Sequence, residues 1–167
     1  KDAYFNVLLG LAARDGQTML AAMAQNDRLV RTDLETLCGT LVGQIIGWMR
    51  RHEGVLRAAL QRSGSGPARW SDFKQLAAAT TNAATPLLLA AMGPSRSAAR
   101  IRSIGFGFQT VFGTLVNAIL NDPGPLSIHH PEMAVRLSRC LLLQLQAEIG
   151  TRSVRQAKRP RVARQRR

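Results

Sequence analysis

The nine residues "GFGFQTVFG", Gly105 to Gly113, resemble a phosphate-binding loop in their glycine content. A dinucleotide-binding fingerprint requires glycines at its first, third and sixth positions, after a strand and at the start of a helix. Gly105 and Gly107 meet the first two requirements, but Thr110 occupies the sixth position, and the preceding "SRSAARIRS" has no strand pattern. The segment is therefore not a nucleotide loop, and its glycines need another explanation.

The histidines do not form a catalytic or metal-binding set. His52 and Glu53 are neighbours at an expected helix junction, so their side chains point in different directions. His129 and His130 lie in an expected loop, where Glu132 is the one nearby residue of a metal-binding type. A zinc site needs three or four ligands at suitable spacing. We predict no metal site.

The acids and thiols give no catalytic arrangement either. The ten acidic residues are scattered, without a pair on an uncharged face that would serve as general acid and base. Cys38 and Cys140 each lie in an apolar stretch with helical spacing, which is typical of buried, reduced thiols in a reducing cytoplasm. We predict that the protein is not an enzyme and has no cofactor.

A small-ligand pocket is better supported, because such sites are mostly apolar with a few polar groups. For each candidate, ordinary core or surface is the alternative interpretation. No buried charge is evident, so the expected ligand is apolar or aromatic and uncharged. The ligand candidates are Gln44, Trp48, Met49, Phe73, Thr81, Asn82, Thr85, Phe108, Gln109 and Phe112.

Composition predicts one all-α domain. The 167 residues are enough to bury a core, and alanine and leucine dominate while aromatic residues are few. The formal net charge is +13, but residues 151–167 hold eight of the 23 basic residues and no acid. The body, residues 1–150, is only mildly basic. The tail, 151–167, is low in apolar residues and is predicted to be disordered.

Apolar spacing predicts about six helices. Thr32 and Glu35 form an expected capping box, Ser71 is an expected N-cap, and Pro86 interrupts one helical pattern. Asp15-Gly16 is a possible break in the first helix. The expected ranges are 2–25, 32–51, a short helix within 53–61, 71–92, 98–121 and 131–149.

Three glycines, Gly39, Gly43 and Gly47, are spaced four apart in the expected second helix. Each costs about 1 kcal/mol relative to alanine inside a helix. We therefore expect a close neighbour on that face, which is either a tightly packed helix or a small molecule beside Trp48.

The two closing helices, 98–121 and 131–149, are apolar on more sides than one domain covers. Six polar residues among the nineteen uncharged residues 103–121 argue against a membrane span. We expect instead a four-helix bundle formed by two copies of the chain, where glycines allow close approach and phenylalanines fill the volume. The expected dimer-interface residues are Ile104, Gly105, Phe106, Gly107, Gly113, Val116, Leu137, Cys140, Leu141 and Leu145.

A rival interpretation makes the basic tail functional. Eight cations in seventeen residues favour salt-sensitive, sequence-independent attachment to nucleic acid. The tail has no aromatic residue for base stacking, which argues against this alternative of a small helical nucleic-acid-binding protein.

The segment "GFGFQTVFGTLVNAILNDPGPLSIHHPEMAVRLSRCLLLQL" resembles the last two helices of TetR-type transcriptional regulators, including the proline-rich loop and "HPE". The opening "KDAYF" is similar to the point where the helix-turn-helix headpiece of that family joins its first regulatory helix. The resemblance covers residues 1 to about 150. This sequence departs from the family in having no helix-turn-helix before "KDAYF".

The resemblance implies a homodimeric regulatory domain, of a repressor or an activator, that binds a small-molecule effector. It also implies that a DNA-binding headpiece lies before Lys1, so that operator binding belongs to a longer parent protein. An effector would shift the first helix, 2–25, and with it the headpieces. We expect a cytoplasmic location and no membrane partner.

Overall fold

The protein is all-helical throughout the part that the computed structural model describes, residues 2–61, 68–94, 97–121 and 127–157. This confirms the predicted all-α class. One turn, α2, is added to the six helices expected. The helices are α1 (Asp2–Ala24), α2 (Asp27–Val30), α3 (Leu34–Arg51), α4 (Glu53–Gln61), α5 (Ala68–Ala91), α6 (Ala98–Asn121) and α7 (Glu132–Ala157).

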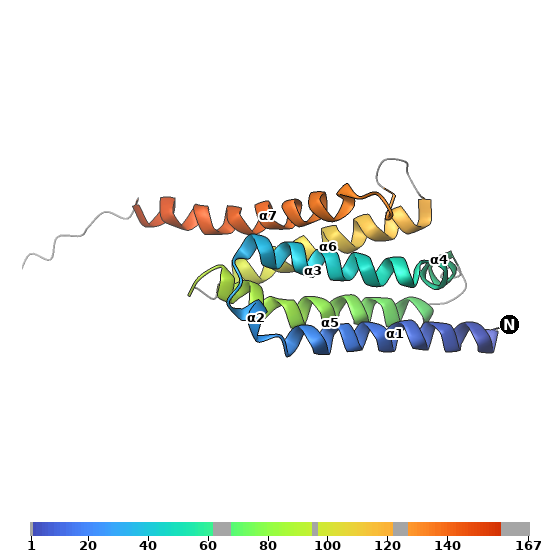
Figure 1. Ribbon diagram of the computed structural model, residues 1–167. Coiled ribbons are helices and arrows are strands. Elements are labelled where there is room, and N and C mark those ends of the chain that lie inside the picture. The colour runs from blue at the N-terminus through green and yellow to red at the C-terminus, as the bar shows by residue number, and fades with distance from the viewer. Residues whose placement is uncertain (1, 62–67, 95–96, 122–126, 158–167) are drawn as a thin grey trace, which may run out of the picture.

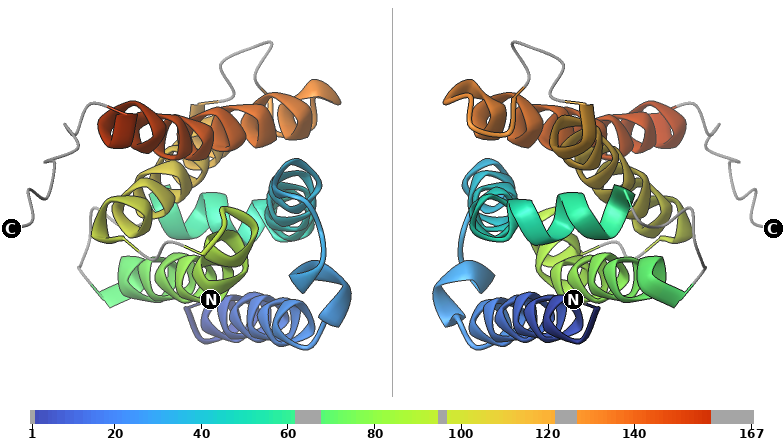
Figure 2. Two further views of the ribbon diagram at one scale, coloured as in Figure 1. Left: turned by 90° about the vertical axis from the view of Figure 1, so that its left-hand side faces the viewer. Right: turned by 90° about the vertical axis from the view of Figure 1, so that its right-hand side faces the viewer.

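The long helices form layers around α3. On one side, α7 lies along both α3 and α6, and on the other side α1 pairs with α5 (Figure 1). The end-on views show α7 across one edge of the molecule, α1 at the opposite edge, and α6 crossing obliquely between α5 and α7 (Figure 2). The C-terminal end of α7 extends beyond the other helices (Figure 1).

The core is centred on α3, which contacts α1, α4, α5, α6 and α7. Its apolar residues recur at helical spacing and are almost fully buried, so the neighbouring helices cover the apolar face of this uncharged stretch. The buried residues of α3 are Leu37, Cys38, Leu41, Val42, Ile45, Ile46, Trp48 and Met49.

Two close approaches join the layers. A Cβ atom added to Gly107 of α6 would lie within contact range of Leu141 on α7, and one added to Gly16 of α1 would lie 2.9 Å from Leu76 Cδ2 on α5. Beside Gly16, the indole Nε1–H of Trp48 donates a hydrogen bond to Ala12 O at 3.1 Å. Glycine therefore serves helix packing at these two positions, and Asp15-Gly16 does not interrupt α1.

The glycines of α3 do not behave as expected. A Cβ atom added to Gly39, Gly43 or Gly47 would meet nothing within 4 Å. Gly39 and Gly43 lie on the exposed face of the helix. The expectation of a close neighbour is therefore wrong within this chain, because the buried face of α3 is its apolar face.

Several helix ends differ from the predicted ones. Asp33, not Thr32, caps α3, because its carboxylate accepts a hydrogen bond from Thr36 N at 2.9 Å. α5 begins at Ala68, three residues before the expected cap at Ser71. α7 continues to Ala157, so the first seven residues of the basic tail are helical rather than disordered. The rest of the tail, 158–167, lies outside the described residues.

Substitution by alanine should have opposite effects on stability at two glycines, Gly93 in the turn between α5 and α6 and Gly39 on the exposed face of α3. Gly93 has a φ of +92°, and its carbonyl accepts a hydrogen bond from Arg100 Nη1 at 3.1 Å. Gly93→Ala should lower the free energy of unfolding by about 1–2 kcal/mol, because an L-residue is strained there. Gly39→Ala should raise it by about 0.5–1 kcal/mol. Urea unfolding of both variants measures this, and a destabilised Gly39→Ala would contradict an open environment at α3.

Candidate ligand groove and dimer face

Four of the ten ligand candidates lie together in one groove between α5 and α6, with a volume of about 470 Å³. We call this the α5–α6 groove. It brings together residues more than 20 positions apart in the sequence, which spacing alone does not predict. Its lining residues are Phe73, Lys74, Ala77, Ala78, Thr81, Gly105, Gln109, Phe112, Gly113 and Val116.

Aromatic side chains form the apolar part of the α5–α6 groove. The rings of Phe73 and Phe112 meet edge to face, with centroids 6.1 Å apart at 87°. Phe108 supports Phe112 from the core, at a centroid distance of 6.3 Å. Edge-to-face pairs are a favoured aromatic geometry, so the two rings hold each other in place.

Polar groups are few in this groove. The Thr81 hydroxyl donates to Ala77 O at 2.9 Å, which uses its one proton and leaves its oxygen able to accept. Gln109 is exposed. Lys74, also exposed, is the one charged side chain among the described lining residues.

The other six ligand candidates do not converge on the groove. Trp48, Met49 and Phe108 are core residues, each at most 3% exposed. Thr85 bonds back to Thr81 O at 2.7 Å, and Asn82 is exposed on α5. The amide oxygen of the remaining candidate, Gln44, is buried without a hydrogen-bond partner.

The ten interface candidates divide into two groups. Ile104 and Gly107 of α6 and Leu137, Leu141 and Leu145 of α7 are buried within a single chain, in the core between the helices. One chain therefore covers more of α6 and α7 than the apolar pattern predicts. The candidates that reach the surface are Gly105, Phe106, Gly113, Val116 and Cys140.

Exposed apolar side chains gather where α6 meets α7. Phe106 is 58% exposed and Leu143 is 55% exposed, and both line a groove of about 400 Å³ together with Cys140. Leu143 also lines a neighbouring groove of about 520 Å³ between α3 and α7, beside Val135. We call this continuous surface, Phe106, Val135, Cys140 and Leu143, the α6–α7 face.

Both thiols are free, but only Cys38 is buried as expected. Burial raises the pKa of Cys38 to about 12, so it stays protonated and unreactive. Cys140 is exposed on the α6–α7 face, which corrects the prediction of two buried cysteines. The error has a simple cause, because the apolar stretch around Cys140 is covered on one side of α7 only.

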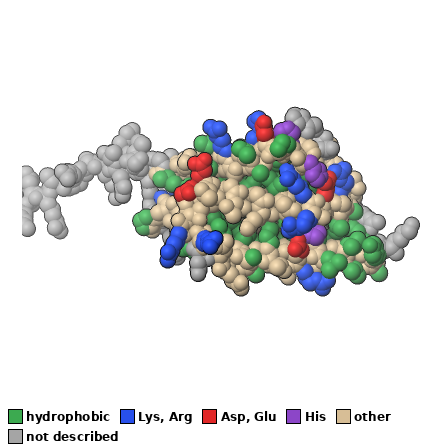
Figure 3. Space-filling model, viewed as in Figure 1, with side chains coloured by type: hydrophobic (Ala, Val, Ile, Leu, Met, Phe, Trp, Pro, Cys, Tyr) green, Lys and Arg blue, Asp and Glu red, His purple; other side chains and the backbone are tan. Residues whose placement is uncertain are grey.

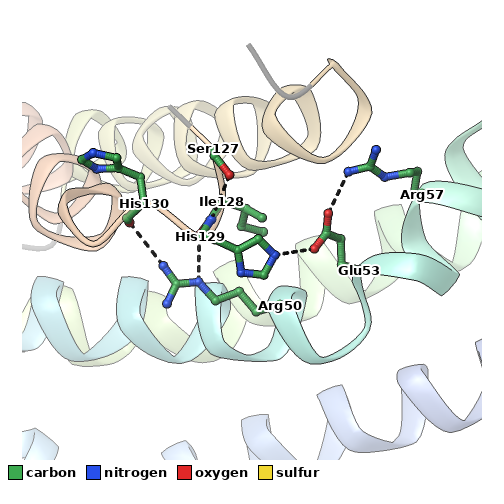
Figure 4. A network of polar contacts seen from close by, with 7 residues as sticks. All are labelled: Arg50, Glu53, Arg57, Ser127, Ile128, His129 and His130. Carbon is green, nitrogen blue, oxygen red and sulfur yellow. Dashed lines mark hydrogen bonds and ion pairs between the residues drawn. The ribbon is translucent and has the colours of Figure 1, made fainter. Parts of the chain in front are cut away.

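The junction between α3 and α4 is a polar centre that the sequence analysis did not identify. Arg50 Nε donates to Ile128 O at 2.7 Å, and its Nη2 donates to His130 O at 3.3 Å. The Glu53 carboxylate pairs with His129 Nε2 at 2.6 Å and with Arg57 at 2.7 Å (Figure 4). These contacts fasten the segment before α7 to the end of α3.

The same junction also holds α1. The Asp15 carboxylate contacts His52 Nε2 at 2.9 Å and Arg51 at 3.3 Å. The hydrogen bond from His52 is the main cause that lowers the pKa of Asp15. Charged and histidine side chains are visible together over this part of the surface (Figure 3). Residues 50–53 therefore join α1 to the segment that leads into α7.

A further apolar patch lies on α1. Tyr4, Val7 and Leu11 follow helical spacing on one face and are 70%, 56% and 48% exposed. Hydrophobic side chains gather over the N-terminal end of α1 in the space-filling view (Figure 3). Within the described residues, no other helix covers this stripe.

The described residues hold no group of three or more His, Cys, Asp or Glu side chains that could bind a metal ion. One described helix, α6, is long and apolar enough to cross a membrane, but 44% of that stretch is buried among the other helices. Core helices of soluble proteins share this property, so the fold is compatible with a soluble protein.

Comparison with known proteins identifies no relative. No family model matches the sequence, and neither a curated protein nor a solved structure matches it. The similarity to TetR-type regulators therefore stays a prediction from the sequence.

The Glu53 contacts predict a pH-dependent contribution to stability. The hydrogen bond from His129 lowers the pKa of Glu53 below its ordinary value of 4.5. Stability from this group is thus present above pH 4.5 and is lost as the pH falls through the lowered value. Glu53→Gln should reduce the free energy of unfolding by about 1 kcal/mol at pH 7. Below pH 4.5 the difference from wild type should shrink.

Urea unfolding at neutral and acidic pH measures this difference. Glu132→Gln is the matched control, because Glu132 also pairs with an arginine four residues later but is 54% exposed and joins no other segment. The control should change stability little at any pH. An equal effect of the two substitutions would contradict a structural role for the junction.

Proposed function

We propose that this chain is the ligand-binding and dimerisation domain of a TetR-type transcriptional regulator, a repressor, located in the cytoplasm. The observation that carries the proposal is the position of α6, which lines the α5–α6 groove on one side and the exposed α6–α7 face on the other. A ligand in the groove would touch the same helix that a partner subunit covers. The free thiols support a reducing cytoplasm.

The α6–α7 face supports dimerisation. Phe106, Val135 and Leu143 are each more than half exposed, and such apolar clusters mark interaction sites. Around them lie the polar residues Thr110, Ser138, Arg139 and Gln146, which suit the rim of an interface. In the proposed dimer, α6 and α7 of both copies form the four-helix bundle.

The contacts of α1 support a path by which ligand binding in the α5–α6 groove would affect a headpiece. α5, which forms one wall of the groove, packs on α1. Asp15 of α1 binds the α3–α4 junction, and this junction binds the segment before α7. The exposed stripe Tyr4, Val7 and Leu11 is the proposed contact of α1 with the headpiece. A coupling of about 1–3 kcal/mol along this route would change DNA affinity about 5- to 150-fold.

The dimer is tested by placing a charge on the α6–α7 face. Phe106→Glu and Leu143→Glu should each weaken dimerisation by about 2 kcal/mol or more, because the interface would bury an unpaired carboxylate. The dissociation constant measured by sedimentation equilibrium should rise roughly thirtyfold or more. Val30→Glu is the control, since Val30 is similarly exposed, at 57%, on α2. A monomeric wild-type chain would overturn the proposed dimer.

DNA binding tests whether sequence-specific recognition depends on a headpiece outside this chain. The full chain should bind DNA weakly, without sequence preference and with steep salt dependence. Removal of residues 158–167, which carry six of the cations, should abolish most of this binding. Fluorescence anisotropy at several salt concentrations measures both. A truncated chain that still selects one DNA sequence would contradict a headpiece-dependent regulator.

A further inference from the structure

The α5–α6 groove combines an apolar wall with a single positive charge. We propose that it binds an aromatic carboxylate, with the carboxylate at Lys74 and the apolar body against Phe73 and Phe112. This inference rests on the proposed ligand-binding function and replaces the uncharged ligand expected from the sequence. Charge complementarity carries it, because the described residues of the lining include one cation and no acid.

The side chains that line the groove favour a small molecule over a second copy of the chain. Among the described residues, none of the strongly exposed large hydrophobic side chains lines the α5–α6 groove, whereas Phe106 and Leu143 are exposed at the α6–α7 face. Phe112 is only 9% exposed. A volume of about 470 Å³ also falls in the range of small-molecule sites.

The glycines of α6 leave this groove open. A Cβ atom at Gly105 or Gly113 would meet nothing within 4 Å, although both residues line the groove. Neither glycine is therefore required for packing within the chain, unlike Gly107. A larger side chain at Gly113 would start in open space and extend into the groove assigned to the ligand.

The polar groups set the length of the ligand. α5 and α6 run in opposite directions (Figure 1), and the contact of Phe73 with Phe112 places Lys74 toward the C-terminal end of α6. Lys74 and Thr81 are seven residues apart on α5, a rise of about 10 Å. An aromatic ring with a short alkyl acid has about this length. A hydroxyl at its far end would donate to Thr81, whose own proton is already used.

The experiment measures binding of three probes by isothermal titration calorimetry at low salt. The probes are phenylbutyrate, its neutral amide and the corresponding amine. Wild type should bind the carboxylate about three- to fivefold more tightly than the amide, as expected for an exposed charge pair, and the amine most weakly. Equal binding of carboxylate and amide would overturn the ligand class but leave the proposed regulator intact. No binding of any probe would overturn the site.

Two substitutions test whether Lys74 causes the preference for the carboxylate and whether the ligand lies in the α5–α6 groove. Lys74→Met should abolish the preference for the carboxylate over the amide. Gly113→Leu should weaken all three probes at least tenfold and leave the melting temperature unlowered. Gly39→Leu, at an exposed α3 glycine with equally open surroundings, is the control and should leave binding unchanged.

The remaining outcomes are also decisive. If Gly113→Leu folds poorly, Ala78→Leu on the opposite wall replaces it, with the same expected loss of binding. Unchanged probe affinity in the filled groove would place the ligand elsewhere and overturn the inference. Conversion of Gly113→Leu to a monomer in sedimentation would show that a second copy covers the groove, which also overturns it. Phe106→Glu tests the α6–α7 face independently of both results.

Discussion

Burial of α3 between two layers is the constraint on which the other helices depend. Its apolar residues are covered by α7 on one side and by α1 and α5 on the other. The charged residues of this helix lie at its two ends. Asp33 caps the first turn, and Arg50 and Arg51 lie in the last turn, where cations are favoured by the helix dipole.

The last turn of α3 therefore has two structural roles. It ends the helix, and its side chains donate hydrogen bonds to backbone carbonyls of the segment before α7. This segment is not part of a helix. Arg50 reaches Ile128 O and His130 O, while Glu53 holds His129. Asp15 of α1 pairs with His52 on the other side of the same turn. A movement of α1 relative to α3 must break these contacts or carry the junction with it.

Local patterns in the sequence were sufficient for the helices and for part of the candidate site. Apolar spacing predicted the class and most helix ranges, because burial on one face repeats with the helix period. Four of the ten ligand candidates, Phe73, Thr81, Gln109 and Phe112, line one groove between α5 and α6. Lys74 was missed, since an exposed lysine beside an aromatic residue has no distinctive spacing.

The predictions that were wrong or missing concerned contacts between residues that are far apart in the sequence. Gly39 and Gly107 both lie in apolar helical stretches. Of the two, only Gly107 faces another helix, where it lies against Leu141 of α7. The junction contacts join residues 36 to 80 positions apart, and no periodicity relates them. Cys140 was assigned to a core because its stretch is apolar, but α7 is covered on one side within the chain.

The position of Trp48 makes the α1–α3 contact accessible to spectroscopy. Its indole is buried, bonded to Ala12 O of α1, and tilted against the His52 ring at a centroid distance of 5.7 Å. An indole in such surroundings emits at short wavelength, and hydration after loss of the Ala12 bond would move the emission to the red. With Trp70 replaced by phenylalanine, Trp48 is the one remaining tryptophan of the sequence. Its emission wavelength then reports whether α1 has moved away from α3.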